Sequence, residues 1–429
     1  MPFWMFSFVL LVILLLGNVP VFIALLGVTF LCALSAADVQ GAIVIQQFVS
    51  GMQSVPLLAI PFFITAGVFM NSTGITRRLI HCCEACFGHL TGGLAQVNVV
   101  LSVLMGGLSG SNIADAAMQS KIIVPQMIRR GYSPAFSSAV TASSSLITPI
   151  IPPGIALIIF GFAGNVSIGR LFLAGVVPGL LLAILLMIVV ARISRKHGYK
   201  PIHDKPNVKA ILLSAKDACW ALLMPIIIIG GIRFGAFTPT EAGSVAVLYA
   251  LFLGFVVYRE MTLSALRQGL SESVVTTVSI LVIIAAASAF SWILTWMRVP
   301  QAIAATMLTR LDSPLSFLVF INLLFLFIGM FIEGNAAMLI LVPIFMPIAR
   351  QLDVNDVHFG IVTVLNMSIA TVTPPMGTIL FTTCAITKTD MGSLLKAMLP
   401  FYVVLFTMLA LVTFLPWICL FLPRLIFGG

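Results

Sequence analysis

Charged residues are scarce along this chain. Of its 429 residues only 8% are Asp, Glu, Lys or Arg, whereas 60% are hydrophobic and the mean hydropathy is +1.17. Soluble domains carry roughly 25% charged residues, so this composition excludes a water-soluble globule and predicts an integral membrane protein. Since one membrane helix needs about 20 apolar residues, the chain is long enough for about a dozen membrane segments.

The signatures of common enzymes and of nucleic-acid-binding proteins are also missing. The glycine-rich run Gly106–Gly110 lacks the Gly-Lys-Ser/Thr of a nucleotide-binding loop, and no zinc-protease or serine-hydrolase motif occurs. The seven cysteines mostly fall in apolar runs, and Cys82, Cys83 and Cys86 lack the second ligand pair of a zinc site. Basic stretches interleaved with aromatics are absent. We therefore expect no enzyme, no disulfide framework and no nucleic-acid partner.

The basic residues predict the orientation in the lipid bilayer. The N-terminal run from Met1 to Leu16 has neither a basic region nor a cleavage site, which favours a retained helix over a signal peptide. The segment 192–216 contains seven basic residues and one acidic one. If this connector is cytoplasmic, most of the other basic residues also fall on that side, as the positive-inside rule requires. Both termini are then predicted to be periplasmic.

Two short apolar helices joined by a polar tip occur twice in the chain. Leu94–Met105 and Ala114–Ile128 flank a tip rich in glycine and serine, and a second pair flanks Ile332–Ala336. A more polar stretch, Asp38–Gln53, favours a helix that lies along the membrane interface. Irregular backbone at membrane depth is tolerated only where it is buried or lines a cavity. We expect two re-entrant hairpins, at about 93–130 and 313–350.

A proline-rich interruption follows each hairpin. The helix after the first hairpin breaks at Thr148–Gly154 and resumes from Ile155 to Gly164, and its counterpart breaks at Thr371–Gly377. Proline removes a backbone donor and clashes with the preceding turn. We expect broken transmembrane helices at about 133–165 and 355–387.

The two halves share one spacing. Each of four prolines in the first half recurs 222 residues later, and the same offset brings Ser111 onto Glu333: Pro125, Pro152, Pro153 and Pro178 onto Pro347, Pro374, Pro375 and Pro400. An internal repeat explains this regularity. Because the predicted topology turns the second copy over, we expect an all-α membrane protein with inverted repeats at 1–200 and 201–429, the plan of many secondary transporters.

Broken helices expose the groups that an ion requires. Freed carbonyls and Ser, Thr and Asn oxygens replace the water around Na⁺, while half-helix N-termini attract an anionic group. Each tip is therefore expected to meet the following break. Close helix packing explains any single Ser or Gly better than ion binding does, but packing alone does not require paired tips and paired breaks.

Glu333 is the most informative single residue. Carboxylates inside a membrane are costly and face a cavity or a partner. Three roles stay open for Glu333: assisting Na⁺, carrying a proton or bonding substrate hydroxyls. A structural ion pair at the tip is the alternative. Asp115, just past the first tip, is a weaker candidate, because stabilisation of a helix N-terminus explains it as well.

These stretches resemble the large membrane subunit of the tripartite ATP-independent periplasmic (TRAP) transporters. The resemblance spans essentially the whole chain and is carried by Gly107–Ser111 with Ile123–Pro125, by Pro149–Pro153, and by His358–Ile361 through Asn366 to Thr373–Gly377. It implies Na⁺-driven uptake of a small organic acid, such as a dicarboxylate, sugar acid or sialic acid, across the bacterial inner membrane. It also implies an elevator-like movement and two partners, a small membrane subunit and a periplasmic substrate-binding protein.

The resemblance further implies which residues bind. Substrate contacts would come from Ser109, Ser111, Gly154 and Glu333, although many relatives have serine where this chain has Gly154. The Na⁺ ligands would be Ser109, Ser111, Asn112, Thr148, Pro152, Gly154, Gly334, Asn335, Thr371, Thr373, Pro374 and Gly377. A stand-alone symporter of related architecture is the alternative. A channel is disfavoured because no charged ring or carbonyl filter is visible.

Overall fold

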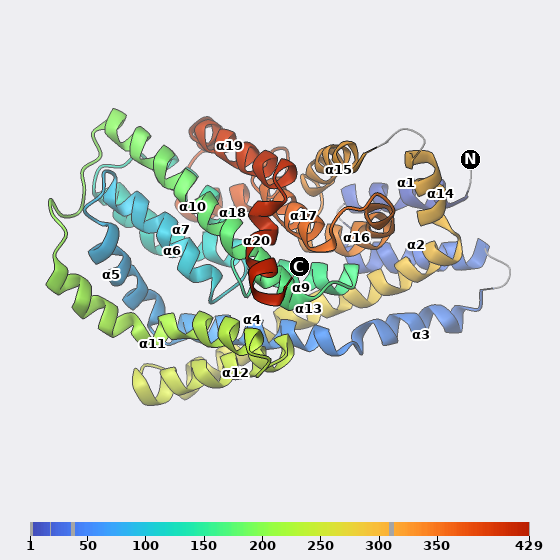
Figure 1. Cartoon of the computed structure of the whole chain (residues 1–429), viewed down its shortest axis with the longest axis horizontal. Helices are drawn as coiled ribbons and strands as arrows, with labels where there is room; N and C mark the ends of the chain where they lie inside the picture. Colours follow the sequence, from blue (N-terminus) through green and yellow to red (C-terminus); the bar gives the residue numbers. More distant parts are fainter. Residues whose placement is uncertain (1–2, 18, 36–38, 309–312, 429) are drawn as a thin grey trace.

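The computed structural model describes residues 3–17, 19–35, 39–308 and 313–428. These residues form helices joined by short connections, and no strand occurs among them (Figure 1). This confirms the predicted all-α class.

The first half runs from α1 to α10. Its helices are α1 (Phe3–Leu16), α2 (Val21–Ser35), α3 (Gly41–Met52), the short 3-10 helix η1 (Val55–Leu58), α4 (Ala59–Ser72), α5 (Ile75–Phe87), α6 (Gly93–Gly106), α7 (Asn112–Arg129), α8 (Pro134–Ser144), the 3-10 turn η2 (Ser145–Ile147), α9 (Ile155–Gly164) and α10 (Ile168–His197). The connector after α10 is followed by the second half.

The second half runs from α11 to α20. Its helices are α11 (Val208–Arg233), α12 (Pro239–Phe252), the π-helical turn η3 (Leu253–Val257), α13 (Leu263–Trp296), α14 (Val299–Leu308), α15 (Pro314–Gly329), α16 (Gly334–Gln351), α17 (Asp356–Ala370), α18 (Thr378–Thr387), α19 (Met391–Phe414) and α20 (Trp417–Phe427). The starts of α7 and α16 lie 222 residues apart, as do those of α8 and α17.

Local sequence explains where these helices begin. Ser111, Ser133 and Glu333 each accept a hydrogen bond from the backbone N–H three residues ahead, which satisfies a donor that the first turn leaves free. Proline occupies the first turn of α8, α12 and α15, where its missing N–H matters least. Helix α10 ends at Gly198, which adopts the left-handed conformation at φ 71°.

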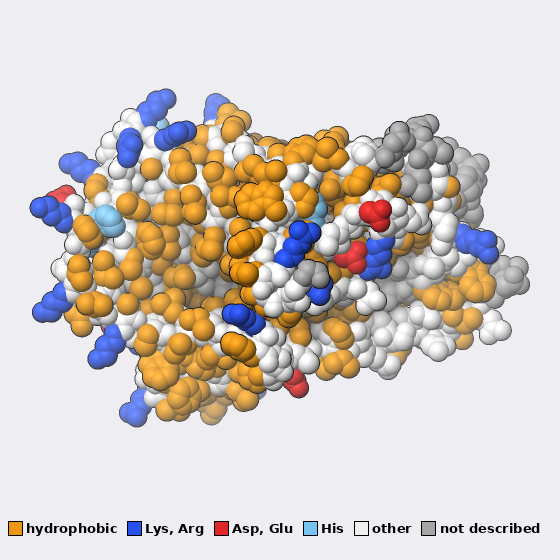
Figure 2. Space-filling view, in the orientation of Figure 1, with side chains coloured by type: hydrophobic (Ala, Val, Ile, Leu, Met, Phe, Trp, Pro, Cys, Tyr) orange, Lys and Arg blue, Asp and Glu red, His pale blue; other side chains and the backbone are white. Residues whose placement is uncertain are grey.

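The surface matches a membrane protein. Seven helical segments among the described residues are long and apolar enough to cross a bilayer, and the longest, Leu263–Trp296, has 34 residues. Hydrophobic side chains cover much of the face in Figure 2, while Lys and Arg gather at one end, on the left of the view. We call this the basic end. It contains the ends of α7 and α10 (Figure 1).

Helix α3 differs from the expected interfacial helix. It packs against α2 and α13 and lies alongside these long helices. The reason is a close approach of small residues: a Cβ atom on Gly51 would lie 2.5 Å from Cβ of Ser288 in α13. Small residues let helices approach closely in membranes, so polar composition alone was a poor guide to the position of this segment.

The hairpins and broken helices form one packed group. The first hairpin (α6, tip 107–111, α7) packs on α8, and α18 also contacts α7. The second hairpin (α15, tip 330–333, α16) packs on α17 and α9. A separate group comprises α2, α3, α4, α12 and α13. The two groups meet where α4 and α13 face the hairpin tips.

Candidate functional site

A cavity lies between the two hairpin tips. It encloses about 940 Å³ of atom-free space, counted to its open mouth, and residues of both tips line it together with α4, α9, α13 and α17. The hairpins approach it from opposite ends of the molecule (Figure 1). We call it the central cavity. Segments more than 200 residues apart in sequence thus share one wall.

The first tip rests directly on the first break, residues 148–154. The backbone N–H of Ile155 donates to the carbonyl oxygen of Gly110 over 3.3 Å. Gly110 has φ 61°, and a Cβ atom there would lie 2.5 Å from the carbonyl oxygen of Pro153. Only glycine combines this conformation with so close a contact. The first tip also approaches α4 closely, because a Cβ atom on Gly67 of α4 would lie 3.0 Å from Cα of Ser109.

A buried carboxylate fixes the first break beneath the tip. Asp115 of α7 is fully buried and accepts hydrogen bonds from Ser102 of α6 (2.8 Å), Gln119 (2.8 Å) and Thr148 (2.9 Å). Because a buried charge is stable only when it is well hydrogen-bonded, these donors must stay together. The cluster therefore joins both arms of the first hairpin to the start of the break.

Asparagine side chains tie each hairpin to the helix before its break. In the first half, Asn98 of α6 donates to Thr141 of α8 over 2.7 Å and accepts from Ser144 over 2.9 Å. In the second half, Asn366 of α17 donates to the carbonyl and side-chain oxygens of Asn322 in α15, both over 2.9 Å. Such interhelical amide bonds hold membrane helices in register.

One polar contact joins the two halves across the cavity. The side-chain amide of Asn112, at the start of α7, lies 3.4 Å from the hydroxyl of Thr371, to which it donates. Thr371 in turn donates to the carbonyl oxygen of Ser368 over 2.6 Å. The start of α7, directly after the first tip, is therefore in contact with the second break, residues 371–377.

The second tip places Glu333 at the cavity wall. Its carboxylate accepts from the backbone N–H of Ala336 over 2.9 Å and from the side-chain amide of Asn335 over 2.8 Å. Glu333 therefore caps α16, and no basic side chain forms an ion pair with it among the described residues. This argues against the structural ion pair and leaves the carboxylate beside the cavity.

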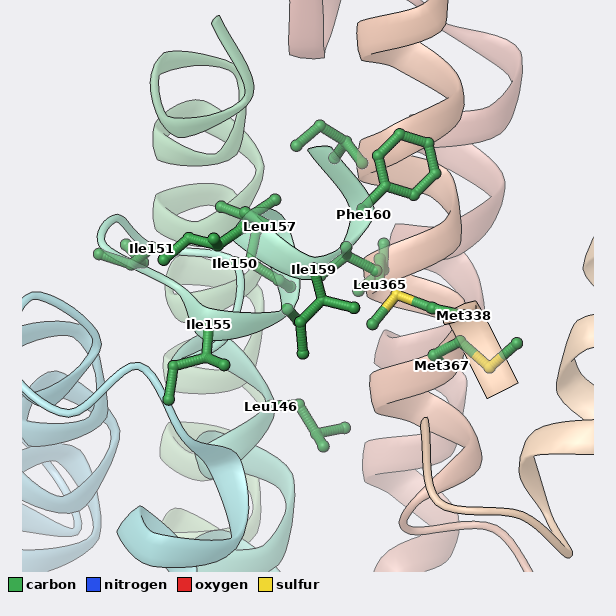
Figure 3. Packing of buried hydrophobic residues seen from close by; sticks show 14 of the residues in the cluster. Leu146, Ile150, Ile151, Ile155, Leu157, Ile159, Phe160, Met338, Leu365 and Met367 are labelled. Carbon is green, nitrogen blue, oxygen red and sulfur yellow. The ribbon is translucent and has the colours of Figure 1, made fainter. Parts of the chain in front are cut away.

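Apolar packing holds the second hairpin in place. A Cβ on Gly329 would lie 2.6 Å from Cβ of Ala370, so α15 ends in close contact with α17. In Figure 3, Met338 of α16 and Leu365 of α17 lie close to Ile159 of α9. Helix α9 is thus sandwiched between the first break, from which it emerges, and the second hairpin.

The structure brings some of the predicted site residues together and separates others. Seven line the central cavity: Ser109, Ser111, Asn112, Glu333, Gly334, Asn335 and Thr371. Six do not appear in its wall: Thr148, Pro152, Gly154, Thr373, Pro374 and Gly377.

The local contacts of these six explain their position. The Thr148 hydroxyl donates a hydrogen bond to Asp115, and the Thr373 hydroxyl donates to the carbonyl oxygen of Ile369 over 2.8 Å. A Cβ atom on Gly154 would overlap the carbonyl oxygen of Pro149. A serine therefore does not fit this backbone, and Gly154 contributes no side chain to the cavity.

The sequence did not predict the residues that line the cavity opposite the hairpin tips. Asn71 of α4 and Glu272 and Thr276 of α13 line it opposite the tips. The signal for Glu272 was available, because an acidic residue within a long apolar helix is a functional candidate by the same rule that selected Glu333. Nothing in the sequence predicts that α4 and α13 face the tips.

The lining of the central cavity is acidic. Two carboxylates, Glu272 and Glu333, line the cavity, and no Lys or Arg among the described residues lines it. The positive ends of two helices compensate in part, since α7 and α16 both begin at the cavity. The remaining polar groups are hydroxyls and side-chain amides, which are neutral oxygen donors suited to a hard cation.

Comparison with known proteins assigns the family. The family model described as the DctM component of the tripartite ATP-independent periplasmic transporter matches residues 8–418. The sialic acid TRAP transporter large permease protein SiaM of Vibrio cholerae is 42% identical over 383 residues, which is 89% of this chain and 90% of that protein. The C4-dicarboxylate large permease DctM of Pseudomonas aeruginosa is 42% identical over 368 residues, 86% of each protein.

Similarity extends to permeases named for other solutes and to a solved transporter. The 2,3-diketo-L-gulonate large permease YiaN of Escherichia coli is 35% identical over 412 residues, 94% of this chain and 95% of that protein. The crystal structure of the YdaH transporter of Alcanivorax borkumensis aligns with a TM-score of 0.65 at 14% identity, over 89% of this chain and 88% of that one, and supports the fold alone. The resemblance drawn from the motifs is confirmed: the chain belongs to the DctM component family of TRAP transporters, a family of membrane permease subunits and not of enzymes.

Proposed function

We propose that this chain is the permease subunit of a Na⁺-coupled secondary transporter that imports a small organic acid across a bacterial inner membrane. A dicarboxylate, a sugar acid or a sialic acid is the expected solute class, since the relatives are named for solutes of these kinds. A periplasmic binding protein delivers the acid, and a small membrane subunit completes the assembly. A relative named as a DctMQ permease, of which this chain covers 64%, agrees with an additional component.

The charge of the central cavity is the observation that carries the proposal. In the part of the chain that the structure describes, two carboxylates and no basic side chain line it. An organic anion that enters alone meets repulsion from both carboxylates, with only two helix N-termini to attract it. A cation bound beside the anion removes this imbalance, so the anion binds well only when the cation is present. The composition of the cavity lining therefore supports cation coupling.

The donor set fits Na⁺. Secondary transporters coordinate Na⁺ with neutral oxygens and freed carbonyls at unwound segments, and both tips and the second break supply such oxygens here. Asn112 and Thr371, joined across the cavity, bring ligands from both halves to one place. We assign the cation to Ser109, Ser111, Asn112, Gly334, Asn335 and Thr371, and the solute to Ser109, Ser111 and Glu333. Residues outside the wall, such as Thr148 and Gly377, would bind only through backbone rearrangement.

Alternating access is proposed to use the two groups of helices. Two oppositely oriented copies, 1–200 and 201–429, would form a mobile unit from the hairpins and broken helices and a frame from α2, α3, α4, α12 and α13. The cavity lies between these groups, so an elevator-like displacement of the mobile unit carries the site along the frame. With the basic end in the cytoplasm, both termini are periplasmic.

Transport measurements test the proposal directly. The protein is reconstituted in liposomes with its small subunit, and uptake of labelled acid is followed with its binding protein outside. We expect accumulation only with an inward Na⁺ gradient and only with the binding protein. Equal uptake when K⁺ replaces Na⁺ would refute the coupling. Strong uptake by this chain alone would favour the stand-alone symporter instead.

A further inference from the structure

A second cavity, lined by basic side chains, lies at the basic end. It encloses about 650 Å³ of atom-free space, counted to its mouth, between α10, α19 and the start of α8. It shares no residue with the central cavity. Lys196, near the end of α10, and Lys396, in the second turn of α19, both line it. We call it the lysine pocket.

Stacked aromatic rings form the floor of the lysine pocket. Beyond Gly198, Tyr199 stacks on Tyr132 at a centroid distance of 4.4 Å and on Phe136 at 5.4 Å. Its hydroxyl accepts from the backbone N–H of Ser133 over 3.2 Å. His197 stacks on the outer side of Tyr199 at 5.7 Å. A site whose floor is already fixed loses little entropy on binding.

The chemistry of the lysine pocket favours an anion. Two lysines from different helices line it, together with an imidazole and Ser133, and no carboxylate of the described residues lines it. The nearest acidic residue along α19 is Asp390, whose carboxylate caps the helix by accepting from the N–H of Ser393 over 2.9 Å. Asp390 also acts on Lys396 through space, but among the described residues neither lysine forms an ion pair, so both ammonium groups are available to an outside anion. Lysine binds phosphate as a compact point charge.

The surroundings of the pocket are apolar toward the membrane. Ile193 and Pro400 line the pocket itself. Farther along the same helices, Ile184 and Ile188 of α10 and Val403 of α19 expose 54%, 45% and 67% of their surface. A charged pocket beside exposed apolar helix surfaces matches a lipid, with its headgroup at the interface and its chains in the bilayer, better than it matches a soluble phosphate.

We propose that the lysine pocket binds the phosphodiester headgroup of an anionic phospholipid. Basic pockets between membrane helices on the cytoplasmic side are typical sites for such headgroups. Because α8 precedes the first break, α19 follows the second broken helix, and α10 packs on α19, the bound lipid would hold together elements from both halves.

Thermal unfolding of the purified protein tests this proposal. Phosphatidylglycerol is titrated into wild type, into the double variant Lys196→Ala/Lys396→Ala and into a control, Arg192→Ala/Arg195→Ala. The control removes the same charge from exposed positions on α10 outside the pocket. At a contribution of roughly fivefold in affinity per lysine near the membrane surface, we expect the pocket variant to bind about 30-fold more weakly. The control should bind like wild type.

The remaining comparisons decide the chemistry of the ligand. Phosphatidylcholine, which has no net charge, should stabilise wild type much less than phosphatidylglycerol, and inorganic phosphate should not reproduce the effect. Equal losses in the pocket variant and the control would overturn the site. Equal stabilisation by the two lipids would overturn the anion selectivity, and full stabilisation by inorganic phosphate would overturn the lipid. None of these measurements depends on transport.

Discussion

Gly110→Ala tests whether the contact between the first tip and the first break is essential. Gly110 lies in the left-handed region at φ 61°, and an added Cβ atom would lie 2.5 Å from the carbonyl oxygen of Pro153. That oxygen belongs to a buried backbone, so it cannot swing aside as a side chain does. Either the tip or the break must move.

The size of the effect follows from the geometry. Ordinary van der Waals contact begins at 3.4 Å, so relief from 2.5 Å requires a displacement on the order of 1 Å. The left-handed conformation alone costs alanine about 1–2 kcal/mol. Overpacking adds about 1–3 kcal/mol. A displacement of this size at a binding site can reduce a rate about 100-fold, so we expect uptake to fall at least tenfold.

Gly131→Ala is the matched control. Gly131 also has a positive φ, 86°, but an added Cβ atom there meets nothing within 4 Å. The two variants share the conformational penalty and differ only in the contact. Uptake into liposomes and the melting temperature are measured for both. We expect Gly131→Ala to transport nearly normally and Gly110→Ala to melt at the lower temperature. Equal uptake by the two variants would show that the tip need not touch the break.

Three further tests examine the polar contacts of the site. Glu333→Ala and Ser111→Ala should each reduce uptake strongly while the protein still folds, at a capping loss of about 1 kcal/mol, and wild-type rates in both would remove them from the site. In a double-mutant cycle, Asn112→Ala and Thr371→Val should couple by about 0.5–1.5 kcal/mol in thermal unfolding, because each loses the same 3.4 Å contact; additive effects would contradict that bond. Asp115→Leu should destabilise the protein by about 1–3 kcal/mol because it removes the acceptor that three buried donors share, whereas Asp115→Asn, which keeps an acceptor oxygen, should cost less.

Much of the fold was accessible from the sequence because its signals are local. The predicted helix Ile155–Gly164 coincides with α9, and the predicted hairpin arm Leu94–Met105 differs from α6 by one residue at each end. Glycine and serine at a tip, or paired prolines at a break, restrict the backbone of neighbouring residues only. Such signals place elements along the chain without any knowledge of tertiary contacts.

The walls of the site were less accessible because they depend on partners far away in sequence. Thr148 sits in the expected break, yet its hydroxyl points to Asp115 and not to the cavity. Glu272 joins the wall only because α13 packs across the tips. The contact between Asn112 and Thr371 spans 259 residues. No periodicity or turn signal encodes which side of a broken helix faces a neighbour.

At the 222-residue offset the two halves share backbone features but not the buried polar cluster. Ser102, Asp115, Gln119 and Thr148, which form the buried cluster of the first half, correspond at this offset to Leu324, Ala337, Leu341 and Ala370. The polar cluster thus has an apolar counterpart, although the prolines, the tip position and the helix starts recur.

Backbone shape and side-chain chemistry therefore vary independently in this protein. The first break is buried and hydrogen-bonded through Asp115, whereas Pro374, Pro375 and Met376 of the second break are exposed. Glycine and proline recur because a hairpin tip and a broken helix need them wherever they occur. Polar side chains need to recur only where both halves bind the same group. A repeat detected through prolines predicts the scaffold of a site reliably, but its ligands must be identified residue by residue in each half.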